Sequence, residues 1–123
     1  MTALDDGREY WPTATSYASE GANAWRKAVH AQISAPAAHS DFYALAADLV
    51  DTLRAFDGLL GVLGRQVAGY VDGRDLYDDA DADPLERLRA AERHLAVTRR
   101  WLAEAERAAN GFWSAIGHIG ERS

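Results

Sequence analysis

Several residue types are missing or scarce in this chain of 123 residues. It has no cysteine, which excludes disulfides, thiolate metal ligands and a cysteine nucleophile. It has only three prolines beside 25 alanines, and this ratio favours helix. No stretch approaches the ~20 apolar residues of a membrane-spanning helix, and the acidic N-terminus lacks the apolar core of a signal peptide. We therefore expect a cytoplasmic, helical protein without a membrane segment.

Basic residues are fewer than acidic ones, and the negative charge is unevenly placed. The net charge is −6, and residues 72–83 alone contribute −5 because they hold six aspartates and one arginine. The rest of the chain is nearly neutral and lacks the broad basic face that non-specific nucleic-acid binding needs. Of the 13 basic residues, 12 are arginine. Together with abundant alanine, glycine and aspartate, this preference is typical of a GC-rich bacterial genome.

Apolar residues recur at helical spacing in three segments, 16–33, 41–71 and 84–117. Pro36 ends the first segment, because the residue before a proline avoids the α region. Ser40 is a favourable N-cap for the second segment. Its apolar residues then form a heptad seam: Phe42, Leu49, Leu53, Phe56, Leu60, Leu63, Val67 and Tyr70.

The third segment begins with the signature of a capping box, in which Asp83 is the N-cap, Pro84 follows at N1 and Glu86 stands at N3. Two apolar seams then repeat every seven residues. The main seam is Leu88, Leu95, Leu102, Ala109 and Ile116, and the second is Ala91, Thr98, Ala105, Phe112 and Ile119. Both seams predict a long, continuous helix.

The lengths and connections of these segments predict an all-α fold. The second and third segments are similar in length and are joined by residues 72–83, so they form a long antiparallel hairpin. The shorter first segment covers only one half of that hairpin, in the manner of a three-helix bundle. We expect residues 1–15 to form an extended arm and residues 16–123 to form a single helical domain, which dimerisation completes.

No motif indicates catalysis or metal binding. Asp79, Asp81 and Asp83 have the spacing that begins an EF-hand loop, but Pro84 and Ala90 replace the glycine and glutamate that the loop requires. The four histidines lack the spacing of metal ligands in helical bundles. No serine or threonine shows an obvious arrangement with a histidine and an acid. We therefore expect no metal, no cofactor and no enzymatic activity.

The least expected feature is a run of three glycines, Gly58, Gly61 and Gly64, within the second segment. Each glycine inside a helix costs ~1 kcal/mol relative to alanine. Three explanations are open: close approach of another helix, a kink or ligand-lined groove, or a stretch that is not helical. We favour close approach. The run does not resemble a phosphate-binding loop, which lies between a strand and a helix.

Two apolar residues beside these glycines lack cover in the predicted hairpin. Leu59 and Val62 point away from the seam that packs on the third segment. We expect a homodimer contact to bury these two side chains, with the three glycines allowing the helix backbones of the two copies to approach each other. The competing explanation is that Tyr10 and Trp11 of the arm cover them within one chain.

These patterns favour a non-enzymatic helical protein–protein interaction or scaffold module that self-associates, with a second copy or another protein as partner. One alternative is a helical small-ligand-binding or sensing protein, whose aromatic pocket contains Trp25, Trp101 and Trp113. Another is an accessory subunit of a bacterial DNA-handling complex that contacts protein more than DNA.

Overall fold

A computed structural model describes residues 13–123, and this part of the chain forms three α-helices. The helices are α1 (Ala14–Ser34), α2 (His39–Ala68) and α3 (Pro84–Gly117). They account for 77% of these residues, among which there is no strand. The prediction of an all-helical fold is confirmed.

The first helix begins earlier than its sequence pattern indicates. Thr13 is the N-cap of α1, and its side-chain oxygen accepts a hydrogen bond of 3.4 Å from the backbone N–H of Ser16. Residues 14 and 15 are therefore helical and do not belong to an arm. The rest of the predicted arm, including Tyr10 and Trp11, lies outside the described residues. At the other end, Ala35 is extended before Pro36, as predicted.

The ends of α2 differ from the prediction. Ala38 is the N-cap and makes no side-chain hydrogen bond, whereas Ser40 lies inside the helix. The N-cap assignment of Ser40 was wrong because the helix already begins at His39, one residue before it, and Ala38 is the extended residue that precedes the helix. The helix ends at Ala68, three residues before the predicted boundary, and Gly69 is its C-cap. It runs without interruption through all three glycines, so the non-helical explanation for them is wrong.

The bounds of α3 agree with the prediction. The carboxylate of Asp83 accepts a hydrogen bond of 3.0 Å from the backbone N–H of Leu85, and Pro84 occupies the first helical position. The side chain of Glu86 accepts a hydrogen bond from Arg89. The start of α3 is therefore capped by Asp83, while Glu86 pairs along its own helix.

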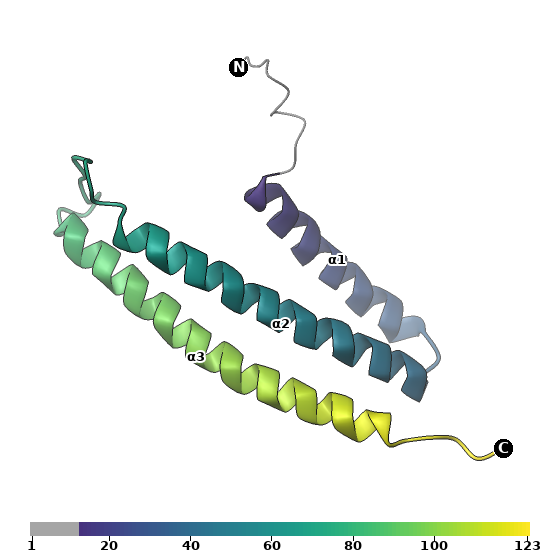
Figure 1. The fold of residues 1–123 in the computed structure, drawn as a ribbon. Helices are drawn as coiled ribbons and strands as arrows, with labels where there is room; N and C mark the ends of the chain where they lie inside the picture. Colours follow the sequence, from purple (N-terminus) through teal and green to yellow (C-terminus); the bar gives the residue numbers. More distant parts are fainter. Residues whose placement is uncertain (1–12) are drawn as a thin grey trace. The chain divides into compact units, whose positions relative to one another are not determined.

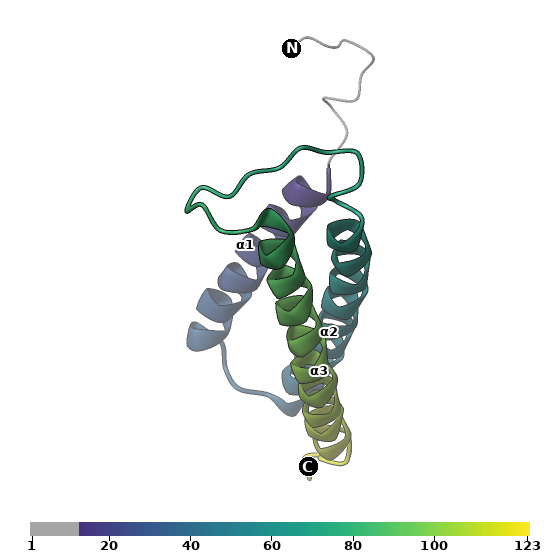
Figure 2. The same ribbon diagram turned by 90° about the vertical axis from the view of Figure 1, so that its left-hand side faces the viewer.

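The chain divides into two compact units between Ala37 and Ala38. The first unit contains α1, in which no residue is buried. Its packing on the hairpin stays a prediction. The second unit contains α2 and α3, which lie side by side and antiparallel (Figures 1 and 2). The predicted helical hairpin is therefore confirmed.

Small residues make the contact between α2 and α3. The buried apolar side chains are Ala46, Val50 and Ala109, and Gly61 is buried beside them. The main predicted seam of α3 faces α2, because its other members are partly buried along with Ala109: Leu88, Leu95, Leu102 and Ile116. The hairpin core is therefore narrow, with Val50 as its only large side chain that is fully buried among the described residues.

The bulky residues of the predicted heptad seam on α2 only partly face α3. Five of its eight members are partly buried, in agreement with the prediction: Phe42, Leu53, Leu60, Leu63 and Val67. The other three, Leu49, Phe56 and Tyr70, are 40–48% exposed. The second predicted seam of α3 is likewise exposed at Thr98, Ala105, Phe112 and Ile119. The fully buried positions of the contact hold small residues instead, namely Ala46, Val50, Gly61 and Ala109, and the leucines lie beside them.

Asp78 organises the acidic connection between α2 and α3. Its carboxylate accepts hydrogen bonds from the backbone N–H groups of Ala80 (2.8 Å) and Ala82 (3.0 Å) and from Nε of Arg87 (2.7 Å). These bonds, that of Arg87 above all, lower the pKa of Asp78 to about 2. Its side chain is only 8% exposed. The connection is thus anchored to the first turn of α3.

Candidate functional site

Two ion pairs cross the middle of the hairpin. Arg99 donates from Nε and Nη2 to the two carboxylate oxygens of Asp57, at 2.9 and 3.2 Å. Arg54 donates from Nε to Glu106 at 2.9 Å. The hydrogen bond from Arg99 lowers the pKa of Asp57. Because all four side chains are partly exposed, the pairs define the register of α2 against α3 more than they stabilise it.

Gly61 makes room for the first of these ion pairs. A Cβ atom at this position would lie 3.3 Å from Nη1 of Arg99 and 3.4 Å from its Cζ. By contrast, no atom lies within 4 Å of a Cβ built on Gly58 or Gly64. Close packing within the hairpin therefore explains only Gly61, and its neighbour is a guanidinium group instead of a helix backbone. The expectation that α3 approaches the other two glycines was wrong.

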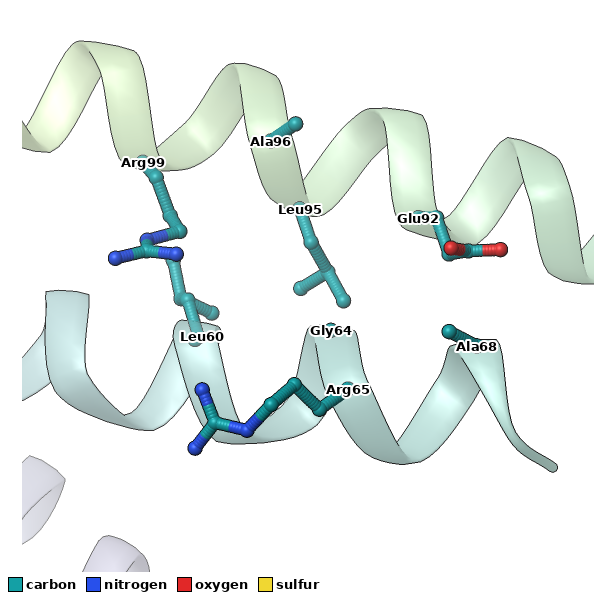
Figure 3. A pocket seen from close by; sticks show the side chains of 9 residues that line it. Leu60, Gly64, Arg65, Ala68, Glu92, Leu95, Ala96 and Arg99 are labelled. Carbon is teal, nitrogen blue, oxygen red and sulfur yellow. The ribbon is translucent and has the colours of Figure 1, made fainter.

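Beyond this ion pair, α2 and α3 enclose a groove of about 310 Å³. Its lining includes four small residues, Gly61, Gly64, Ala68 and Ala96, and the side chain of Leu95 extends into it toward Gly64 (Figure 3). Figure 3 shows the guanidinium groups of Arg65 and Arg99 near Leu60, at one end of the groove. The carboxylate of Glu92 lies above Ala68, at the other end (Figure 3). The groove is therefore positive at one end and negative at the other.

The opposite face of the hairpin carries large apolar side chains. On α2 these are Leu49, Phe56 and Leu59, on α3 they are Trp101 and Phe112, and Ile119 follows two residues after the end of α3. Each is at least 40% exposed. A rotation of about 100° per residue places each stripe on the side of its helix that faces away from the groove. We call these six residues the apolar face.

Of the five residues predicted for self-association, Leu59, Val62 and Gly58 lie on the outer side of α2, whereas Gly61 is buried against Arg99 of α3. Leu59 is 43% exposed and belongs to the apolar face, while Val62 is 39% exposed on the neighbouring side. Gly58 is exposed, and Gly64 lines the groove. This placement agrees with the inference that Leu59 and Val62 point away from α3.

The three tryptophans of the predicted pocket occupy different places. Trp113 is partly buried and packs at 59° to the ring of Tyr43, with a centroid distance of 5.8 Å. Both line a groove of about 490 Å³ with Asn110, Ser114 and His118. Trp101 is 69% exposed and does not line this groove. Trp25 belongs to the other unit and is partly exposed.

Tyr43 was not singled out from the sequence, although the register of the hairpin contains the signal. Tyr43 precedes Asp57 by 14 residues, and Trp113 follows Arg99 by 14 residues. In an antiparallel hairpin aligned on that ion pair, the two rings stand at the same level. Gly117 leaves room for the Tyr43 ring, because a Cβ there would lie 3.1 Å from Cε1.

Two further observations concern sites of other kinds. Within residues 13–123, no three or more His, Asp or Glu side chains are grouped closely enough to hold a metal ion. In the same part of the chain, no helix combines the length and the apolar character needed to cross a membrane. Comparison with known proteins gives no match to a family model, a curated protein or a solved structure.

Proposed function

We propose that the protein is a non-enzymatic helical protein–protein interaction module that self-associates as a homodimer. The observation that supports this proposal is the apolar face, with Phe56 47% and Trp101 69% exposed. Soluble monomers rarely expose a contiguous apolar patch larger than a few hundred Å². A second copy that packs on this face supplies the helices needed for a four-helix core.

Burial of the apolar face by a second copy is energetically favourable. Full burial of a large apolar side chain stabilises a protein by roughly 1.5–3 kcal/mol. The six residues of the apolar face are each about half exposed, so covering them contributes roughly 5 kcal/mol per chain. That is comparable to the whole stability of a small domain, about 5–15 kcal/mol. This contribution matters because the buried core of the hairpin is small, with Ala46, Val50 and Ala109 as its buried apolar side chains.

The proposed contact runs along the apolar face and continues onto the outer side of α2. Leu59 extends the apolar face toward that side, and Val62 continues it. Gly58, beside Leu59, has no neighbour within the hairpin near its Cβ position, so the backbone of another helix can approach it closely.

Sedimentation equilibrium at tens of micromolar tests the proposal. We expect a dimer of the 13.4 kDa chain. Val62→Glu places a charge in the contact and is expected to convert the dimer to monomer. Arg100→Glu, on the exposed outer side of α3, is the control and is expected to leave the dimer intact. A wild-type monomer would overturn the proposal and indicate that the apolar face is covered within one chain.

A second candidate function is binding of a small aromatic ligand between Tyr43 and Trp113. The observation that favours it is the adjacent groove, together with the buried indole Nε1–H of Trp113, which has no hydrogen-bond acceptor among the described residues. A screen of planar aromatic compounds by tryptophan fluorescence tests this function. Trp113→Phe is expected to abolish any specific signal, whereas Trp101→Phe is expected to preserve it. Equal signals from the two variants contradict the assignment.

A further inference from the structure

We infer that His94 makes the proposed self-association depend on pH. The dimer forms while the imidazole of His94 is neutral, and it dissociates when the imidazole takes up a proton, between about pH 7 and pH 6. The inference rests on the proposed homodimer and specifies how the contact on the apolar face is regulated.

The position of His94 on α3 places it in the stripe that a second copy covers. His94 precedes Trp101 by seven residues and Phe112 by 18. At about 100° per residue, these separations bring the three side chains to within about 20° of one direction around α3. His94 is exposed, as are Trp101 and Phe112. A partner that lies along this stripe therefore covers His94 as well.

The neighbours of His94 along α3 carry no charge. The residues three and four positions away, which share its side of the helix, are Ala90, Ala91, Val97 and Thr98. Glu92 lines the groove on the other side of the hairpin, and Arg93 is turned about 100° away from His94. Arg87, one heptad before His94, is held by the carboxylate of Asp78.

The part of α2 beside His94 is apolar too. Within residues 13–123, α2 is the helix that packs on α3. In the register set by the ion pair between Asp57 and Arg99, Leu63 lies nearly level with His94 on the apolar side of α2. The nearest charged groups of α2 belong to the groove side, where Asp57 binds Arg99 and Arg65 lines the groove. The imidazole of His94 makes no ion pair within residues 13–123.

Cover by a second copy therefore disfavours the charged form of His94. A protonated imidazolium that is buried against apolar side chains loses its hydration and gains no carboxylate in return, because the partner presents the same apolar face. A neutral imidazole loses far less. Proton uptake and association consequently oppose each other. An isologous dimer uses the same patch on both copies, so two imidazoles are covered in each dimer.

Sedimentation equilibrium at pH 7.5 and pH 5.5 tests the inference. We expect the Kd of the wild-type dimer to rise by up to about 100-fold at the lower pH, about tenfold for each of the two imidazoles, since a free imidazole titrates near pH 6.5. His94→Gln keeps a polar side chain that does not titrate, and it is expected to dimerise equally at both pH values. His118→Gln, at the C-cap of α3 and outside the stripe, is the matched control and is expected to keep the wild-type response.

A second variant covers the case in which glutamine itself weakens the contact. His94→Leu adds an apolar side chain and is expected to hold the dimer together at pH 5.5, with helical circular dichroism unchanged at both pH values. A wild-type dimer that is equally tight at both pH values, a pH response that persists in His94→Gln, or dissociation of the leucine variant at pH 5.5 overturns the role of His94 and leaves the proposed function standing. A wild-type monomer at pH 7.5 overturns both.

Discussion

The groove face and the apolar face of the hairpin use the same two helices in different ways. The groove face has glycine, alanine and charged side chains, and Arg99 reaches Asp57 across it. The apolar face has bulky side chains such as Phe56 and Phe112, which are about half exposed. The two helices therefore bury small residues against each other, form an ion pair on the groove face, and leave bulky apolar side chains about half exposed on the apolar face.

The strongest test of this difference is to place an acidic residue in the contact between the helices and another on the apolar face. Val50→Asp buries an unpaired charge between α2 and α3 and is expected to cost several kcal/mol, enough to unfold the hairpin. Phe56→Asp changes a half-exposed position and is expected to preserve the helices while it weakens dimerisation. Circular dichroism and urea unfolding of both variants distinguish these effects. Equal loss of helix would contradict the division between a small core and an exposed face.

Alanine substitutions at Gly61 and Gly64 compare a position beside an ion pair with one in open space. Gly64→Ala is expected to stabilise the hairpin by about 1 kcal/mol, because the added methyl meets open space and helix propensity improves. Gly61→Ala is expected to gain less, because its methyl presses on the guanidinium of Arg99 at 3.3 Å. Urea unfolding at concentrations low enough to avoid dimerisation measures both.

Asp78 in the acidic connection is expected to have a smaller, pH-dependent effect on stability. The pKa of Asp78 is lowered to about 2 in the folded protein, from an ordinary value near 3.8. Its contribution to stability is therefore present above about pH 4 and is lost as the pH falls toward 2. We expect the thermal midpoint to decline over this range, and to decline less in Asp78→Asn. Asp79→Asn, on the exposed side of the same connection, is the matched control. Identical pH profiles for the two variants would contradict the anchoring role of Asp78.

The smallest expected effect is that of a chelator. Asp79, Asp81 and Asp83 precede Pro84, which begins a helix where an EF-hand loop turns sharply. We expect EDTA to leave the thermal midpoint unchanged. A decrease that calcium or zinc reverses would identify a metal site in the acidic connection or among the histidines.

The sequence alone determined the helices and the hairpin, because these depend on local chemistry. Apolar spacing identified three helices, and Asp83 with Pro84 located the start of α3 to the residue. The scarcity of breakers within 84–117 and the single connection 72–83 predicted two antiparallel helices. The ends of α2 were less predictable, because alanine and serine near a helix start have similar propensities when no side-chain cap is formed.

Only the tertiary structure decided which side of each helix faces the other. The heptad pattern predicted that Leu49 and Phe56 lie in the contact. It contains no information about the ion pair between Asp57 and Arg99, or about the space that Gly61 leaves for the Arg99 side chain. These are pairwise contacts between residues 38 to 42 positions apart, and no periodicity within one helix contains them. The side of α2 that contacts α3 therefore lies a fraction of a turn away from the heptad stripe. The antiparallel register of the two helices, and no pattern within α3, places Tyr43 beside Trp113.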